Sequence, residues 1–205
     1  MSMTLRVVVP PHALIAHWLT MLRDEDTPNP LYAKSLEELG KWLTYEALRD
    51  WLPHREEEVN TTKGKATGKV IESRIPLLAL PQIPGGLELW NGARTVLPNG
   101  TLCIGGVPKS IDENAGIIIY RDQITDGNDL IEIIKQLGLQ NIDTKRIRVI
   151  TPLAARPGLQ NLGGQIPNLN IYCACIDAEL SVNGEITPGI GNPSLRLNTK
   201  TEGLN

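Results

Sequence analysis

The segment whose residue types best suit contact with a ligand is residues 187–193, with the sequence TPGIGNP. Glycine lets a main chain approach a ligand closely, and proline fixes the direction of that approach. A rigid loop that offers N–H and C=O groups in place of side chains suits the recognition of a flat, polar small molecule. The same composition is also typical of a stiff surface turn, so the residues alone leave both interpretations open.

Charge and length exclude several classes of protein. The formal net charge is −3 and Lys and Arg are scattered along the chain, so the sequence does not favour a nucleic-acid partner. The apolar start at residues 7–9 is cut by Pro10 and Pro11, which suits neither a secretory signal nor a membrane span. A chain of 205 residues can bury a sizeable core but is short for two domains. We expect one domain over residues 1–205, a cytoplasmic location and no membrane span.

Three cysteines stand at positions 103, 173 and 175. An odd count in a chain without a secretory signal predicts reduced thiols. Cys173 and Cys175 alternate on an expected strand and share a face, but a metal site would need further ligands, and the histidines lie far away in sequence. We therefore expect these two cysteines to be core residues and predict no metal site.

Two amphipathic helices are predicted near the N-terminus. In residues 12–23 apolar side chains recur at the i, i+3, i+4, i+7 spacing of a helix, and residues 35–51 show a similar stripe. Ser35, with a glutamate three residues later, forms a capping box that places the start of the second helix. The two stripes are broader than one sheet face needs. We interpret Trp18 and Trp42 as packing or subunit contacts rather than as platforms for stacked bases.

The rest of the chain alternates apolar runs with helical segments. A polar stretch at residues 55–67 predicts a β-hairpin, and an Asn-Gly pair at 183–184 predicts a tight turn. Strands are expected at residues 5–9, 75–80, 102–104, 117–120, 146–150 and 171–176, and helices at 87–96 and 129–137. This alternation predicts an α/β fold with a mostly parallel, twisted sheet flanked by helices. Ligands bind such sheets beyond the carboxyl ends of the strands, which points to the loops at 81–86, 121–128, 151–158 and 187–193.

With these loops collected, the chain resembles the uracil phosphoribosyltransferase family over nearly all of its length. The resemblance depends on five short motifs that occur in the same order as in the family. They are HAL…LTMLRD at 12–24, YEALRD at 45–50, AARPG at 154–158, ID at 176–177 and PGIG at 188–191, and Arg196 follows the last of them. It implies a phosphoribosyltransferase fold with N-terminal helices and a C-terminal, hood-like base-binding region. It also implies a reaction of pyrimidine salvage, in which uracil and phosphoribosyl pyrophosphate (PRPP) give UMP and pyrophosphate with Mg²⁺. The base-binding residues that it implies are Tyr172, Gly189, Ile190 and Gly191.

The expected phosphate loop departs from the family pattern. The family has a Thr-Gly-Gly-Ser loop in which small residues let backbone N–H groups surround a phosphate at a helix N-terminus. Its counterparts here are Asp122, Thr125, Asp126, Gly127 and Asn128. An aspartate replaces a glycine, and Asp129 follows directly. A carboxylate within about 4 Å of a phosphate costs several kcal/mol before screening, so we expect PRPP binding to be lost, although the spacing would allow Asp122 to contact the ribose.

Two further segments depart from the pattern. The family's Arg-Ala-Gly turn, which helps to hold pyrophosphate, corresponds here to Pro84, Gly85 and Gly86, and proline has neither the charge nor the N–H. The family's Tyr-Arg-Asp and the long hairpin after it, which cover the site, correspond to a short segment at 108–116. Loss of that cover would admit water to the reaction.

Three changes in three substrate-contacting segments favour a non-catalytic binding, scaffold or regulatory subunit. Two alternatives stay open, an active uracil phosphoribosyltransferase with an altered loop and a regulator that senses a nucleobase or nucleotide. We assign no catalytic residue and expect no cofactor, with Mg²⁺ needed only if the chain is an active enzyme. The expected partners are a second copy, forming a homodimer through the helices of Trp18 and Trp42, an unidentified protein, and uracil or a nucleotide as a ligand.

Overall fold

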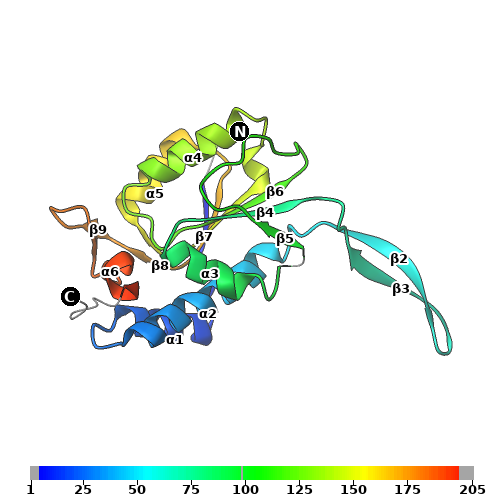
Figure 1. The fold of residues 1–205 in the computed structure, drawn as a ribbon, viewed down its shortest axis with the longest axis horizontal. Coiled ribbons are helices and arrows are strands. Elements are labelled where there is room, and N and C mark those ends of the chain that lie inside the picture. Colours follow the sequence, from blue (N-terminus) through cyan, green and yellow to red (C-terminus); the bar gives the residue numbers. More distant parts are fainter. Residues whose placement is uncertain (1–4, 98, 199–205) are drawn as a thin grey trace, which may run out of the picture.

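A six-stranded sheet forms the centre of the computed structural model, which describes residues 5–97 and 99–198 (Figure 1). All neighbouring strands of this sheet are parallel. In spatial order they are β1 (Arg6–Val8), β8 (Asn170–Asp177), β7 (Ile147–Ala155), β6 (Gly116–Tyr120), β4 (Leu77–Pro81) and β5 (Gly100–Leu102). Every residue of β6 and β7 is buried, as expected for central strands covered on both faces. The predicted parallel α/β fold is confirmed.

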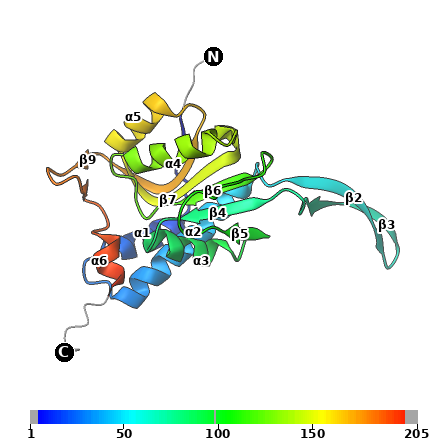
Figure 2. The same cartoon turned by 45° about the horizontal axis from the view of Figure 1, so that its top comes forward.

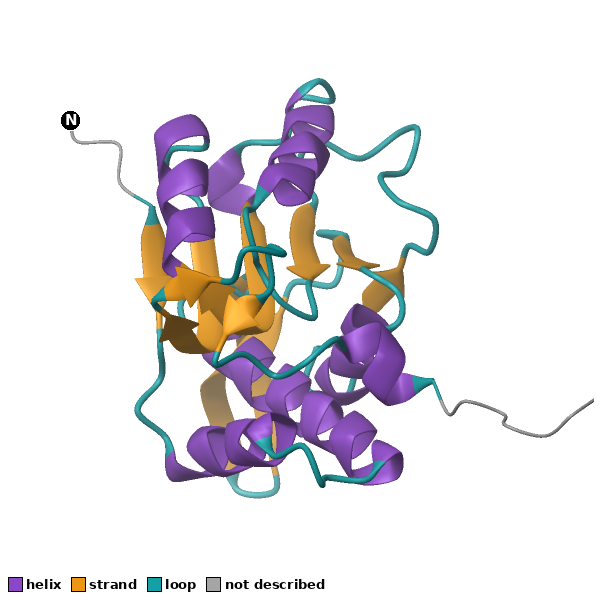
Figure 3. Cartoon of the chain, turned by 90° about the vertical axis from the view of Figure 1, so that its left-hand side faces the viewer, coloured by secondary structure: helices purple, strands orange, loops and turns teal. Residues whose placement is uncertain are grey.

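Helices cover both faces of the sheet (Figures 1 and 2). One face carries α4 (Asn128–Gly138) and α5 (Arg156–Gln165), and the other carries α1 (Ala13–Arg23), α2 (Asn29–Leu48) and α3 (Gly85–Ala93). Figure 3 shows the resulting three layers from the side. Each face has its own apolar cluster, because side chains of a strand alternate between the two faces.

The second N-terminal helix begins earlier than the sequence predicted. α2 starts at Asn29, with Pro30 in its first turn, a position that proline favours because its missing N–H would have no helical partner there. Ser35 is not a cap, since it lies within α2 and its hydroxyl donates to the Leu31 carbonyl at 2.7 Å. The first helix agrees with prediction, and the His12 side chain caps it by accepting from the Leu14 N–H at 3.1 Å.

The loop predicted at residues 151–158 does not exist. β7 continues to Ala155 and α5 begins at Arg156, without a connecting loop. The pattern was misleading because a proline follows Thr151, yet the residues after it remain buried and stay in the strand. Gly158, in the first turn of α5, packs so closely on the loop after β6 that a Cβ there would lie 2.1 Å from the Thr125 carbonyl oxygen.

Two hairpins extend from the layered body. The longer one, β2 (His54–Thr61) with β3 (Gly64–Ile71), projects from the sheet as predicted, and all eight residues of β2 are exposed (Figure 1). The shorter one, β9 (Glu179–Leu180) with β10 (Ile186–Thr187), contains the predicted turn at Gly184, where φ is +79°. Two short helical segments, η1 (Thr144–Arg146) and α6 (Pro193–Leu197), complete the described elements.

Neither a membrane-crossing helix nor a clustered metal site is found in the described residues. None of the helices within 5–97 and 99–198 combines the length and apolar character that spanning a bilayer requires. Over the same ranges, no three His, Cys, Asp or Glu side chains are grouped to hold a metal ion. Cys173 is buried and Cys103 and Cys175 are half-buried, all as free thiols.

Candidate functional site

A polar hollow lies at the carboxyl ends of β4 and β6. Its volume is about 210 Å³. It draws together three of the loops that the sequence singled out, and its lining residues are Gln82, Arg121, Asp122, Gln123, Thr125, Asp129, Asn192, Pro193 and Ser194. The fourth segment, residues 151–158, contacts the hollow's wall from outside, because Gly158 packs on the backbone of Thr125. The position agrees with the rule that ligands of parallel sheets bind beyond the carboxyl ends of the strands.

The expected phosphate loop enters α4 through Gly127, whose φ of +77° requires a residue that tolerates the left-handed region. The polar side chains around this loop are hydrogen-bonded to one another and to its backbone. The Asp126 carboxylate accepts from the Asn128 N–H at 3.1 Å and from the Asn128 side-chain amide at 2.7 Å. Asn161, from α5, donates to the Asp126 carbonyl oxygen and to the Asn128 side chain. The Asn128 N–H at the start of α4 is therefore already bonded to a carboxylate of the protein.

A buried arginine stands beside this loop and is also occupied. Arg121 is 6% exposed and forms an ion pair with Asp129, in the first turn of α4. Burial lowers the pKa of Arg121, which Asp122 partly offsets. Asp122 is itself 7% exposed, and burial raises the pKa of its carboxyl above the ordinary range. Sequence reasoning included Asp122 but assigned no role to the Arg121–Asp129 pair, which only the fold brings together.

The expected pyrophosphate turn packs directly on the expected phosphate loop. Pro84 follows a cis peptide bond and precedes α3. A Cβ on Gly85 would lie 2.4 Å from the Asp122 Cβ, and one on Gly86 would lie 2.4 Å from the Tyr120 carbonyl oxygen. These glycines therefore serve close packing between two strand ends, which leaves no room for a larger side chain at either position.

The expected base-binding loop is held in a defined conformation. Gly189 and Gly191 have φ angles of +71° and +72°. The Gly189 N–H donates to Asp177 at 3.0 Å, and its carbonyl oxygen accepts from Arg23 at 2.8 Å. The hydroxyl of Tyr32 donates to the carbonyl oxygen of the intervening Ile190 at 3.3 Å. The loop backbone is thus fixed from three sides, by a strand and two helices.

An ion pair between the first helix and the last long strand anchors this loop. The Arg23 guanidinium donates to both carboxylate oxygens of Asp177, at 2.9 and 2.7 Å. Burial disfavours the charged form of Asp177, but the hydrogen bonds from Arg23 and the Gly189 N–H outweigh burial and lower the pKa of this carboxyl. A hollow of about 470 Å³ opens beside the anchored loop, between Arg23, Gly191 and Arg196 among others.

Tyr172 is not brought to the expected base-binding loop. It lies near the start of β8, whereas the loop contacts Asp177 at the end of that strand. At about 3.3 Å per residue the two positions are about 17 Å apart. Tyr172 is 2% exposed and pairs in register with Ile150 of β7, so its position is that of a core side chain.

The short segment expected to replace the family's cover is bonded at Pro108 to the far end of α4. The Pro108 carbonyl oxygen accepts from the side-chain amide of Gln140 at 2.8 Å. Gln140 follows the end of α4, while the hollow lies at the start of that helix. An 11-residue helix is about 16 Å long, so this contact ties Pro108 to the C-terminal end of α4, while the residues just before it, Gly105 to Val107, stay beside Gln82 and Arg121.

The chain matches the family model "Uracil phosphoribosyltransferase" over residues 9–105 and 99–198. The uracil phosphoribosyltransferase of Nostoc sp. is 34% identical over 96% of this chain and 99% of its own length, and that of Synechocystis sp. is 35% identical over 94% and 96%. The chloroplastic uracil phosphoribosyltransferase of Arabidopsis thaliana is 32% identical over 91% of this chain and 68% of its own length.

A solved structure shares the whole fold. The AQ2163 protein from Aquifex aeolicus superimposes with a TM-score of 0.80 at 26% identity, over 93% of this chain and 97% of that one. The family model spans nearly the same range, and the Nostoc relative aligns over 96% of this chain. The chain belongs to the uracil phosphoribosyltransferase family.

Proposed function

We propose that this chain has lost PRPP-dependent catalysis and serves as a non-catalytic binding, scaffold or regulatory subunit. The observation that carries the proposal is the pair of carboxylates at the start of α4, from Asp126 and Asp129. One is bonded to the loop's own amides, and the other neutralises the buried arginine beside the loop. The Asn128 N–H and the positive charge of the arginine are therefore already engaged by carboxylates of the protein.

Magnitudes support this interpretation. Two unit charges 4 Å apart repel by about 1 kcal/mol in water and about 4 kcal/mol near a protein surface, and a phosphate can carry two charges. The attraction of an anion to a helix N-terminus is about 0.3–1 kcal/mol at an exposed site. Because Asp126 is exposed, the true repulsion lies towards the lower figure, and it still matches or exceeds the attraction. The proline at position 84, which lacks both a charge and an N–H, removes a further contact.

Turnover is the direct test. We expect purified protein incubated with uracil, PRPP and Mg²⁺ to form UMP only at the background rate, measured by chromatography. The uracil phosphoribosyltransferase of Synechocystis sp., assayed under the same conditions, is the positive control. UMP formation at a rate near that of the control would refute the loss of catalysis and leave an active enzyme with an altered loop.

A nucleobase-sensing role is the second candidate, and the base-binding loop is the observation that favours it. The backbone of residues 189–191 is fixed by Arg23, Tyr32 and Asp177 although the phosphate loop has changed. A loop kept in a binding conformation needs little ordering when a ligand arrives, and this saving strengthens binding.

Uracil titration tests the second candidate. A ligand that binds only the folded state raises its stability by about 2.7 kcal/mol at a hundred times its Kd. We expect uracil to raise the melting temperature and PRPP to leave it unchanged, measured by thermal shift with each ligand alone. If neither uracil nor UMP shifts the transition, the sensing role is refuted and binding of a protein partner remains.

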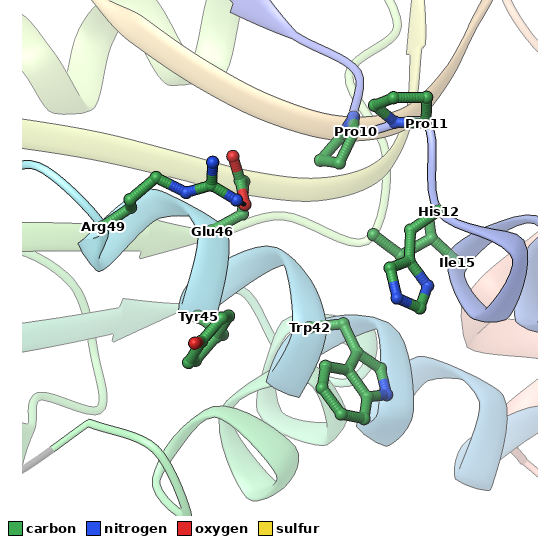
Figure 4. Close-up of a pocket in the computed structure, with 8 residues that line it drawn as sticks. All are labelled: Pro10, Pro11, His12, Ile15, Trp42, Tyr45, Glu46 and Arg49. Atoms are coloured by element: carbon green, nitrogen blue, oxygen red, sulfur yellow. Dashed lines mark hydrogen bonds and ion pairs between the residues drawn. The ribbon is translucent and has the colours of Figure 1, made fainter.

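We also propose that the chain forms a homodimer through its N-terminal helices. A hollow of about 370 Å³ opens on this face between the Pro10–Pro11 turn and α2 (Figure 4). The rings of His12 and Trp42 stand nearly parallel in it, 6.1 Å apart, and Tyr45 beside them is 60% exposed. A second hollow, of about 360 Å³, adjoins it on the other side of Tyr45. Exposed aromatic side chains beside hollows are typical of subunit contacts.

The homodimer has a simple test. We expect a dimer at micromolar concentration in analytical ultracentrifugation, and Tyr45→Glu should raise the dissociation constant by about tenfold or more. Leu139→Glu is the matched control, since Leu139 is 86% exposed after α4 on the opposite face. A monomeric wild-type protein would contradict the proposal, as would equal effects of the two variants.

A further inference from the structure

Two side chains at neighbouring strand ends, Gln82 and Arg121, face the same side of the sheet. Pro81 of β4 pairs in register with Tyr120 of β6, and the Gln82 N–H continues the ladder by donating to the Tyr120 carbonyl oxygen at 2.9 Å. The next residues, Gln82 and Arg121, are therefore opposite each other. In a parallel pair, opposite residues project from the same face, about 5 Å apart. Here that face is the one covered by α4.

These two side chains stand between two adjoining hollows. One is the polar hollow of about 210 Å³. The other, of about 280 Å³, is lined mostly by apolar residues under α4 and by the loop after β5, among them Leu80, Ile119, Ile133, Cys103 and Val107. Gln82 and Arg121 line both hollows, so a ligand that enters either one meets the same two polar groups.

Both groups carry a buried atom without a hydrogen-bond partner among the described residues. In Arg121 it is Nε, a donor, and in Gln82 it is Oε1, an acceptor. Arg121 is 6% exposed. Leaving buried donors and acceptors unpaired lowers stability, and native structures rarely keep them without a reason. A ligand that satisfies both atoms needs an acceptor for the Arg121 Nε–H group and a donor for Gln82 Oε1.

The surrounding charges select a ligand without net charge. The Arg121 guanidinium is already paired with Asp129, so the site offers an anion no free positive charge. Asp122, 7% exposed, adds a further carboxylate to the wall. A cation would meet these carboxylates, but it carries no acceptor for the Arg121 Nε–H group.

We propose that Gln82 and Arg121 form a binding site for a small, planar, neutral amide with a compact apolar body. The amide oxygen accepts from Arg121 Nε, the amide N–H donates to Gln82 Oε1, and the apolar body fills the hollow under α4. The site rests on the proposed function, because bound PRPP would occupy the same strand ends. Its anchoring side chains differ from the expected base-binding residues 189–191, whose backbone is held by Asp177 at the end of β8.

Benzamide is the probe, with benzoate and benzamidine as anionic and cationic analogues of the same shape. Cys103 lines the apolar hollow and is a half-buried free thiol, so its alkylation by iodoacetamide, followed by mass spectrometry, reports on access to that hollow. We expect benzamide to slow alkylation of Cys103 in a saturable manner and to leave Cys175 unaffected. Benzoate and benzamidine should protect about tenfold more weakly.

Gln82→Leu removes the acceptor without removing bulk. Because the Gln82 side chain makes no hydrogen bond in the described structure, this variant should be at least as stable as the wild type in urea denaturation, while its affinity for benzamide falls about tenfold or more. Gln136→Leu, at an exposed position on α4, is the matched control and should keep wild-type affinity.

Three results would overturn the site: no protection of Cys103 by benzamide, tighter binding of benzoate or benzamidine, or unchanged affinity in Gln82→Leu. Tighter benzoate binding would mean that the Gln82 amide presents its nitrogen to the ligand. Uracil is not a suitable probe, because the base-binding loop is expected to bind it. The two proposals fail separately, since UMP formation tests only the loss of turnover and Cys103 protection tests only the amide site.

Discussion

Replacing Asp177 with alanine is expected to lower the free energy of unfolding by about 3 kcal/mol or more, measured by urea denaturation. Asp177 is 6% exposed, and its carboxylate accepts two hydrogen bonds from Arg23 and one from the Gly189 N–H. The substitution removes all three and leaves the arginine charge partly buried without a partner, with its side chain only 25% exposed. The effect is large because the variant leaves the Arg23 charge without a partner, which costs more free energy than the intact ion pair contributes to stability.

The controls for this prediction separate the charge from the shape. Asp177→Asn keeps the shape and should lose less than the alanine variant. Asp50→Ala removes one partner of the Arg6–Asp50 pair, whose side chains are 59% and 55% exposed, and should change stability by about 0.5 kcal/mol at most. If the Asp177 and Asp50 alanine variants lost equal stability, the anchoring role of Arg23–Asp177 would be wrong.

The same pair gives the pH dependence of stability a definite sign. The native pKa of Asp177 is lowered from its ordinary value of 3.8. The stabilisation is complete at neutral pH, because both states are then ionised and only the folded state has the partner. As pH falls below about 3.8 the unfolded chain takes up a proton first, so the stabilisation falls until the pH has passed the lower native pKa. Asp177→Asn should remove this part of the acid-induced loss.

The sheet could be predicted from sequence because its signal is local. The run Ile117–Tyr120 is apolar at every position, and a strand covered on both faces has that composition. The start of α2 was mispredicted for a local reason too. A capping box at Ser35 competes with a proline-led first turn at Asn29, and packing of α2 over the whole sheet face decides in favour of the longer helix.

The contacts that define the site could not be predicted in this way. Arg23 and Asp177 are separated by 154 positions, and no periodic pattern relates them. The pairing of Gln82 with Arg121 depends on the register of β4 against β6, which apolar runs do not specify. The family resemblance identified the loops that meet at the site, but it can suggest roles only for residues that have a counterpart in the family. Side chains peculiar to this chain are visible only in the fold.

Restoring the phosphate loop is expected to restore phosphate binding. The triple variant Asp126→Gly, Asn128→Ser, Asp129→Ala recreates the family's Thr-Gly-Gly-Ser loop and removes both carboxylates. It also releases Arg121 from its ion pair, so the variant should be less stable than the wild type in the absence of an anion. Bound phosphate would then face a helix N-terminus and a free guanidinium, both of which favour it.

The size of the gain can be stated. At a hundred times its Kd, a ligand adds about 2.7 kcal/mol of stability, which for a chain of this size corresponds to a rise of about 5 °C or more in melting temperature. We expect that rise with inorganic phosphate or PRPP in the triple variant and none in the wild type. Asp143→Ala is the matched control, because it removes one carboxylate from the start of another helical segment, η1, and should show no response.

The restored loop also separates binding from turnover. Pro84 still lacks the charge and the N–H of the family's turn, and the segment at residues 108–116 is still shorter than the covering hairpin expected from the family resemblance. The triple variant should therefore bind PRPP and yet form UMP only at the background rate. UMP formation by this variant would mean that the changes in the phosphate loop alone had abolished catalysis. If phosphate raised the melting temperature of the wild-type protein as much as that of the variant, the role assigned to Asp126 and Asp129 would be refuted.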